Sequence, residues 1–182
     1  MSTNAEAFAG PQAIDCIMPA AGLSERMGRW KPFIPYPDSG GRPLVEVSVE
    51  RALEVCSRVI LVAGYRGREL EELFSGAAGV LCVRNGEFRR GMFSSIQTGA
   101  AVVEAPLFFI AHADMPEIPS ELYRLLLERM VSRGHAGDQG PEMVRPLYRD
   151  RPGHPVLCRR RVASSILAEA PESNMQQVMN HH

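Results

Sequence analysis

Short apolar runs alternate with amphipathic segments along this chain. The apolar runs, bounded by turn residues, predict buried strands over residues 14–19, 58–63, 80–83, 106–111, 143–148 and 155–158. The segments between them carry apolar residues at helical spacing and predict helices over residues 44–56, 68–74, 93–103, 119–133 and 159–169. Strands that alternate with helices need crossover connections. We therefore expect an α/β fold in three layers, α/β/α, with a mainly parallel twisted sheet.

Length and composition fit one globular domain. The 182 residues are 45% hydrophobic and 7% aromatic, and the formal net charge is −1, which argues against a broad nucleic-acid-binding surface. We expect a flexible leader over residues 1–12 and a single domain over residues 13–182. The four cysteines lie in or beside apolar runs, which predicts buried free thiols. No export signal or membrane-spanning run is visible, so we expect a cytoplasmic protein with no membrane partner.

The polar and glycine-rich segments follow strands of the predicted sheet. Residues 20–31 follow the first strand, Gly64 follows the second, and Asp114 follows the fourth. Ligands of open α/β sheets bind beyond the carboxyl ends of the strands. These segments are therefore expected to converge on one binding site.

The loop after the first strand has the chemistry of an anion site. Ala20, Ala21 and Gly22 are small enough for a ligand to approach the backbone, Gly22 can take a positive φ, and Ser24 can cap a following helix. Successive amides in such a turn bind anions. Arg26 and Lys31 add a forked cation and a point charge suited to phosphate groups.

This loop also resembles a known signature. The string Pro19-Ala20-Ala21-Gly22-Leu23-Ser24-Glu25-Arg26-Met27-Gly28, followed by Lys31, is similar to that of the molybdenum cofactor nucleotidyltransferases, with Pro19 in place of the usual leucine. That family includes the molybdopterin cytidylyl- and guanylyltransferases. The resemblance implies a Rossmann-like nucleotidyltransferase fold. The Ala-Ala-Gly version resembles the cytidylyl branch, which favours CTP over GTP.

Three later segments match the same family in order. The first, Gly91 to Ile96, implies that Asn85, Ser94 and Ser95 lie near the base and ribose of the nucleotide, although the serines could equally cap a helix. The second, Asp114-Met115-Pro116, resembles the family's Mg²⁺-binding segment, with Ala113 where glycine is usual. A carboxylate there is well placed for Mg²⁺. The third contains His154, which either faces the pterin substrate or stabilises its loop.

The end of the chain departs from the family pattern. Asn174 stands near where an aspartate is usual, which puts a second acidic metal ligand in doubt. The chain ends at His182 without the family's Asp-x-Asp-Thr-Pro motif, so whether the domain lacks its last strand stays open, as does whether His181-His182 is native or left from an expression tag.

The predicted reaction is transfer of a cytidylyl group from CTP to the phosphate of molybdopterin or molybdenum cofactor, with release of pyrophosphate. Arg26, Lys31 and Asp114 are the candidate catalytic residues, and a molybdoenzyme or its chaperone is the candidate protein partner. Two alternatives remain: guanylyl or other nucleotidyl transfer to a different phosphorylated acceptor, and a binding module without chemistry. Ala113, Asn174 and the early end of the chain support the second alternative.

Overall fold

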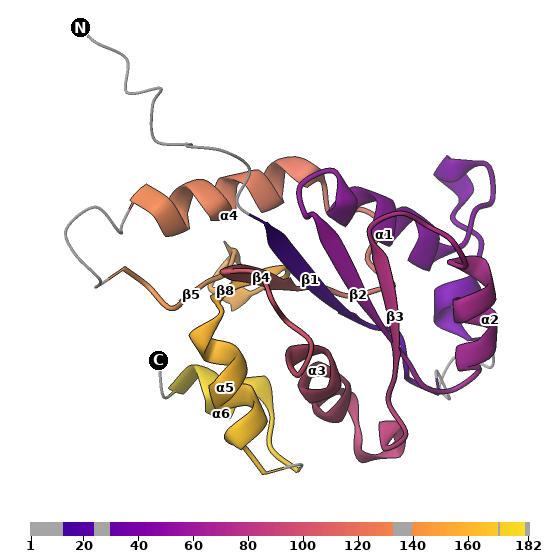
Figure 1. Ribbon diagram of the computed structural model, residues 1–182. Coiled ribbons are helices and arrows are strands. Elements are labelled where there is room, and N and C mark those ends of the chain that lie inside the picture. The colour runs from indigo at the N-terminus through magenta and orange to yellow at the C-terminus, as the bar shows by residue number, and fades with distance from the viewer. Residues whose placement is uncertain (1–12, 24–29, 133–139, 171, 181–182) are drawn as a thin grey trace, which may run out of the picture.

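The computed structural model describes residues 13–23, 30–132, 140–170 and 172–180. Figure 1 shows a twisted sheet between two layers of helices, which confirms the expected three-layer α/β/α fold. The six strands of the sheet lie in the order β3-β2-β1-β4-β8-β5. Their bounds are Ile14–Pro19 (β1), Arg58–Ala63 (β2), Val80–Arg84 (β3), Leu107–Ile110 (β4), Met143–Val144 (β5) and Val156–Arg159 (β8). The strands from β3 to β4 are parallel to one another, and β8 is antiparallel to β4.

Helices cover both faces of this sheet. Helices α1 (Leu44–Leu53), α2 (Gly67–Leu73) and α4 (Ser120–Ser132) pack on one face. Helices α3 (Met92–Ala100), α5 (Arg161–Ala168) and α6 (Met175–Asn180) pack on the other. Three short 3₁₀ turns, η2 (Lys31–Phe33), η3 (Pro37–Ser39) and η4 (Phe88–Arg90), lie in the connections. None of the helices within the described residues has the length and apolar character needed to cross a membrane.

Alternation along the buried strands builds two cores. In β1, Cys16 and Met18 face α1 and α4, whereas Ile17 faces α3. Because neighbouring side chains of a strand point to opposite faces, a strand covered on both sides is apolar throughout. This is why continuous apolar runs, and not alternating ones, marked the central strands correctly.

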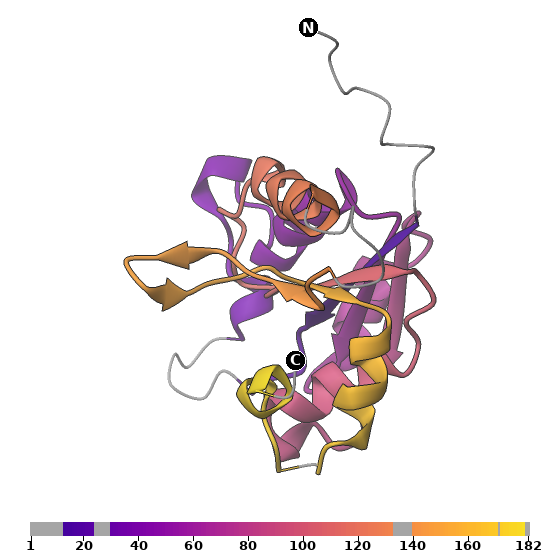
Figure 2. The same cartoon turned by 90° about the vertical axis from the view of Figure 1, so that its left-hand side faces the viewer.

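One predicted strand is wrong. Residues 143–148 do not form a single strand: β5 ends at Val144, and β6 (Leu147–Tyr148) pairs instead with β7 (Arg151–Pro152) in a separate hairpin. Pro146 interrupts the run because proline has no amide hydrogen for a sheet ladder. Arg149 and Asp150 then take positive φ angles of 48° and 60°, as a tight two-residue hairpin turn requires. Figure 2 shows this hairpin projecting from the body of the molecule.

The other departures are smaller. Helix α6 was not expected from the sequence, and Asn174 caps its start, since its Oδ1 accepts a hydrogen bond from the Gln177 amide at 3.1 Å. The four cysteines are free thiols, three of them buried and Cys82 half-buried. The predicted leader and the terminal histidine pair lie outside the described residues.

A buried ion pair, which the apolar pattern did not reveal, ties β1 to β2. The Asp15 carboxylate accepts two hydrogen bonds from Arg58, both at 2.9 Å, and others from the amides of Glu104 and Ala105. Burial alone would raise the pKa of Asp15, but the Arg58 guanidinium and the two amides outweigh it and hold the pKa below its ordinary value. The carboxylate therefore stays charged inside the fold.

Replacing Asp15 with asparagine is expected to lower the free energy of unfolding by about 3 kcal/mol, because it leaves the Arg58 charge without its buried partner. Chemical denaturation measures this effect. Since the fold lowers the pKa, the contribution is present above the ordinary value of 3.8 and is lost as the pH falls through the lower folded value. Glu104→Gln is the control, since Glu104 also pairs with Arg58 but is 78% exposed. Equal losses in the two variants would contradict the account.

Candidate functional site

The site begins as a row of residues across the carboxyl edge of the parallel strands. Pro19 pairs with Val62, and Ile17 pairs with Ile110. Backbone hydrogen bonds continue past the strand ends: the Tyr65 amide donates to the Ala21 carbonyl at 3.2 Å, and the Ala111 amide donates to the Ile17 carbonyl at 3.0 Å. The segments after β1 and β4 therefore meet at this edge, as expected, whereas Gly64 packs closely against Ala21 and does not line the cavity there.

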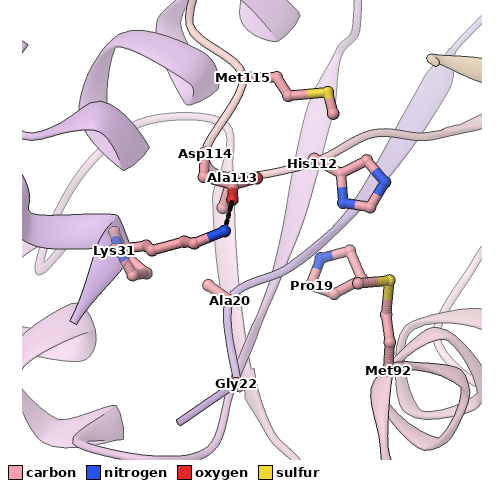
Figure 3. A pocket seen from close by; sticks show the side chains of 10 residues that line it. Pro19, Ala20, Gly22, Lys31, Met92, His112, Ala113, Asp114 and Met115 are labelled. Atoms are coloured by element: carbon pink, nitrogen blue, oxygen red, sulfur yellow. Dashed lines mark hydrogen bonds and ion pairs between the residues drawn. The ribbon is translucent and has the colours of Figure 1, made fainter. Parts of the chain in front are cut away.

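Part of this edge is hollowed into a cavity of about 390 Å³, within the range of small-molecule sites. Figure 3 shows Lys31 reaching from one side toward Asp114, with His112 on the other side. Ala20 and Gly22 lie below Asp114 in that view, and Met115 and Met92 lie above and below His112. The cavity is lined by Pro19, Ala20, Gly22, Lys31, Pro32, Met92, His112, Ala113, Asp114 and Met115.

Lys31 and Asp114 form an ion pair in the cavity. The Lys31 ammonium donates to Asp114 Oδ2 at 3.2 Å, and the two side chains are 43% and 31% exposed. Water and a bound ion can therefore reach both groups. Lys31 is also the only lysine in the sequence.

Aromatic packing fixes the position of Lys31. Trp30, directly before it, is buried and stacks on Phe33 with ring centroids 4.8 Å apart. Tyr65 meets the Trp30 ring edge-on at 6.2 Å, and the Arg66 guanidinium lies 5.2 Å from its centroid. These contacts anchor the 3₁₀ turn η2, so the Lys31 side chain extends from a fixed base.

Asp114 is held at the end of β4. The Ala111 amide donates to the Ile17 carbonyl at 3.0 Å, which continues the pairing with β1, and Ala113 is buried against the cavity. No cluster of three or more histidine, cysteine or acidic side chains that could hold a metal occurs among the described residues. Mg²⁺ commonly binds through one or two carboxylates together with substrate phosphates. Asp114 therefore fits a metal ion that arrives with a nucleotide.

Two histidines meet beside Asp114. The rings of His112 and His154 contact edge to face, with centroids 4.1 Å apart. Burial and then the neighbouring His154 lower the pKa of His112 to about 4. Burial also lowers the pKa of His154, whose Nδ1 lies 3.5 Å from the Ile110 carbonyl. Both rings are therefore neutral near pH 7 and can offer a hydrogen-bond donor or acceptor without charge.

Asn85, Ser94 and Ser95 form a buried polar cluster that joins the end of β3 to the start of α3. The Asn85 side-chain amide donates to the two serine hydroxyls at 2.9 and 3.0 Å, and its carbonyl oxygen accepts from the Glu87 amide at 2.8 Å. Ser94 in turn donates to the Gly91 carbonyl at 2.8 Å. These bonds fix the loop between β3 and α3. The three side chains do not line the cavity as the described residues form it.

Gly64 and Gly22 differ in the space around their α-carbons. A β-carbon at Gly64 would lie 2.7 Å from the β-carbons of Ala21 and Phe88, so Gly64 permits close packing of the loops. At Gly22 a β-carbon would meet nothing within 4 Å among the described atoms. The positive φ considered for Gly22 is not adopted, and its backbone instead borders open space in the cavity.

Two of the predicted site residues, Ser24 and Arg26, lie outside the described residues. Asn174, considered as a substitute for an acidic ligand, caps α6 and contributes nothing to the described cavity. Met92 and Met115 were not expected to line a site, because methionines near strand and helix ends are typical of packing.

An open cavity with a lysine, a carboxylate and accessible backbone at strand ends is suited to a phosphorylated ligand. Comparison with known families agrees with this chemistry: residues 16–182 match the MobA-like NTP transferase domain. The chain belongs to this family. The match covers the whole sheet apart from the first two residues of β1.

Named relatives agree with the family. The chain is 32% identical over 167 residues to the molybdenum cofactor cytidylyltransferase of Escherichia coli (strain K12), covering 92% of this chain and 81% of that protein. It is 29% identical over 168 residues to a probable molybdenum cofactor guanylyltransferase of Natronomonas pharaonis, covering 90% and 81%.

Solved structures share the fold. A nucleotidyl transferase from Methanothermobacter superposes with a TM-score of 0.73 at 22% identity, covering 92% of this chain and 80% of that one. Rv0371c from Mycobacterium tuberculosis H37Rv, in a complex with manganese, superposes with a TM-score of 0.68 at 17% identity, covering 92% and 82%. The mainly parallel sheet with helices on both faces is thus the fold of known nucleotidyltransferases.

Proposed function

We propose that this protein transfers the cytidylyl group of CTP to the phosphate of molybdopterin or molybdenum cofactor and releases pyrophosphate. The observation that carries the proposal is the Lys31–Asp114 pair in a cavity at the carboxyl ends of β1 and β4. Family membership and the 32% identity to a molybdenum cofactor cytidylyltransferase support the same reaction.

The transfer is a single displacement at phosphorus. An oxygen of the acceptor's phosphate forms a bond to the α-phosphorus of CTP, the bond from that phosphorus to the bridging oxygen breaks, and pyrophosphate leaves with the electron pair. Little covalent chemistry is left to the protein, so its residues position the reactants and stabilise charge. The amides from Ala21 to Ser24 are predicted to donate to the phosphate groups, and Lys31 offsets negative charge on the leaving pyrophosphate.

Asp114 is the proposed ligand of Mg²⁺ or another divalent ion. Such an ion neutralises charge on the phosphate oxygens and makes phosphorus more electrophilic. The carboxylate reaches the cavity, and its partner Lys31 is only 3.2 Å away. The ion pair keeps both groups at the cavity, where Asp114 would hold the metal ion and Lys31 would donate to a phosphate oxygen. The manganese complex of a protein with the same fold supports a divalent ion.

The remaining residue roles belong to the same proposal. Arg26 is predicted to fork onto phosphate oxygens, and Ser24 to cap the segment that follows the Ala-Ala-Gly turn. Asn85, Ser94 and Ser95 are predicted to lie near the nucleoside. Their mutual hydrogen bonds support a second task, holding the loop before α3 in place. A cytoplasmic location and delivery of product to a molybdoenzyme or its chaperone remain predictions from the sequence.

Among the four nucleoside triphosphates, CTP with Mg²⁺ is expected to raise the melting temperature of the protein most. At about 100 times its dissociation constant, a ligand that binds only the folded state stabilises it by about 2.7 kcal/mol. For a chain of this size that corresponds to roughly 5–10 °C. Differential scanning fluorimetry with CTP, GTP, UTP and ATP at equal concentration measures the ranking.

Each outcome of this ranking has a definite meaning. CTP in first place, followed by pyrophosphate release when molybdopterin is added, supports cytidylyl transfer. GTP in first place would favour the guanylyl alternative, to which the 29% relative also corresponds. CTP binding with no pyrophosphate release would favour the binding module without chemistry.

A further inference from the structure

The cavity lies at the end of the sheet, where the two faces of the sheet meet. Residues next to each other in a strand point to opposite faces. In β1, Ile17 packs in the core that α3 covers, whereas Met18 and Ala20 pack in the core that α1 and α4 cover. Pro19 lies between Met18 and Ala20 and lines the cavity, so it points to the α3 side.

His112 points to the same side as Pro19. At the end of β4, Ile110 packs in the core that α3 covers, and Ala113 packs in the other core. His112 comes two residues after Ile110 and directly before Ala113, so the alternation of the strand places it on the α3 side. Two neighbouring strands thus send one cavity residue each toward α3.

The α3 side of the cavity suits a flat ring. Its wall consists of Pro19, His112 and Met92, which is the first residue of α3. Figure 3 shows these three side chains across the cavity from Lys31. Met92 is 56% exposed, and a thioether sulfur makes favourable contacts with aromatic rings. The imidazole of His112 adds a second aromatic contact, whereas the phosphate-binding chemistry lies on the side of Lys31.

A proline at position 19 leaves room on the α3 side. This position usually holds leucine in the signature that the loop resembles. The proline side chain closes back onto its own backbone nitrogen, so it extends less far from the strand than a leucine side chain. A leucine here would point to the same face, toward Met92 and His112, and would fill part of the cavity.

The proline also removes one hydrogen bond between β1 and β4. The Ala20 amide donates to the Val62 carbonyl of β2 at 2.9 Å, and the Ala111 amide donates to the Ile17 carbonyl at 3.0 Å. Because the amides of a strand alternate between its two neighbours, an amide at position 19 would face β4, where the Ala111 carbonyl is the next acceptor. Proline has no amide hydrogen. Substitution by alanine restores a donor without filling the cavity, and substitution by leucine does both.

We infer that Pro19 is a specificity-determining residue, which keeps the α3 side of the cavity open for the heterocyclic ring of a substrate. The inference rests on the proposed transfer reaction, whose two substrates each carry such a ring: cytosine in CTP and the pterin in the acceptor. Pro19 supplies space and an apolar wall, whereas charge stabilisation belongs to Lys31 and Asp114. Its substitution therefore affects substrate binding more than the rate at saturation.

The test measures the two substrates separately. Pro19→Leu is expected to weaken binding of one substrate about 10-fold, because the added side chain overfills the space that its ring occupies. The dissociation constant of CTP comes from calorimetry with Mg²⁺, and the KM for molybdopterin comes from pyrophosphate release. A rise confined to the CTP constant assigns the space to cytosine, and a rise confined to the KM assigns it to the pterin. The kcat is expected to change less than about threefold.

Pro19→Ala is the matched control, because it gains the same backbone donor but leaves the cavity open. Its two constants are expected to stay within about twofold of the wild type. Melting temperatures of both variants should stay close to the wild type, since the restored hydrogen bond offsets the added freedom of the unfolded chain. Pro19→Val, with a shorter side chain, is expected to give an intermediate rise and covers the case that the leucine variant does not fold.

The outcomes distinguish this inference from the proposed function. If the wild type releases no pyrophosphate from CTP with molybdopterin, the proposed function fails and this inference fails with it. If the wild type is active and Pro19→Leu changes neither constant, the inference fails and the function stands. Equal rises in Pro19→Ala and Pro19→Leu would assign the effect to the backbone hydrogen bond and overturn the inference. Equal rises of both constants in Pro19→Leu would indicate a general distortion of the cavity and also overturn it.

Discussion

Replacing Asp114 with asparagine is expected to lower kcat for cytidylyl transfer by roughly 1,000-fold. The substitution keeps the shape of the side chain but removes the charge that would hold a divalent ion against the triphosphate. Loss of one preorganised charge-stabilising group costs about 100- to 1,000-fold in rate, and this residue is the carboxylate that lines the described cavity. Initial rates of pyrophosphate release at saturating CTP and molybdopterin measure the effect.

Glu117→Gln is the control for Asp114→Asn. The substitution removes the same charge three residues further along the chain. Glu117 is exposed and does not line this cavity. It is expected to retain nearly the full rate. Raising the Mg²⁺ concentration should recover part of the Asp114→Asn rate, because the variant is predicted to bind the ion more weakly. A normal kcat in Asp114→Asn would remove the metal-binding role from the account.

Replacing Lys31 with alanine is expected to lower kcat by about 100-fold or more. Its ammonium lies 3.2 Å from Asp114 Oδ2 in the cavity proposed to bind the triphosphate. The positive charge is predicted to be worth most when the pyrophosphate leaves, so kcat should fall more than the affinity for CTP. Rates at saturating CTP, together with the dissociation constant of CTP from calorimetry, measure the two effects.

The variant Lys31→Arg tests whether charge alone suffices at this position. Arginine keeps the charge but has a different shape and reach, and we expect it to restore only part of the rate. Melting temperatures should stay close to that of the wild type in both variants, because the ion pair with Asp114 is largely exposed and contributes about 1 kcal/mol or less. A near-normal kcat in Lys31→Ala would refute its assigned role.

The central strands could be predicted from the sequence because burial on both faces leaves a distinct mark. Residues 14–19 and 58–63 are continuous apolar runs that end at turn residues, and the structure places β1 and β2 within the same bounds. The hairpin could not be predicted in the same way. Its strands are two residues each and exposed, so neither apolar pattern nor length marks them.

Helix α6 and Asp15 escaped prediction for related reasons. Only Val178 of α6 is buried, and one buried residue does not make a helical pattern. Asp15 sits inside an apolar run, and nothing nearby in the sequence indicates that Arg58 will lie opposite it. A pairing across 43 positions of the chain depends on strand order, which short-range patterns do not contain.

The same distinction applies to the site. Strand ends could be expected to meet because they share one edge of a parallel sheet, and this brings Lys31 to Asp114 across 83 positions. The contact of His112 with His154 could not be expected, because it needs β8 to run antiparallel beside β4. The sequence predicted that Lys31 and Asp114 share one site, and the structure added His112, Met92 and Met115 to the lining of the same cavity.

The central claim is that a triphosphate binds in the cavity between the end of β1 and Asp114. The single lysine of the sequence makes a direct measurement possible. Reductive methylation with isotope-labelled formaldehyde keeps the charge of Lys31 and gives it a nuclear magnetic resonance signal, which Lys31→Arg identifies by removing it. CTP with Mg²⁺ is predicted to move this signal in a saturable way at the dissociation constant found by calorimetry. A signal that stays in place while calorimetry reports full binding of CTP would contradict the claim.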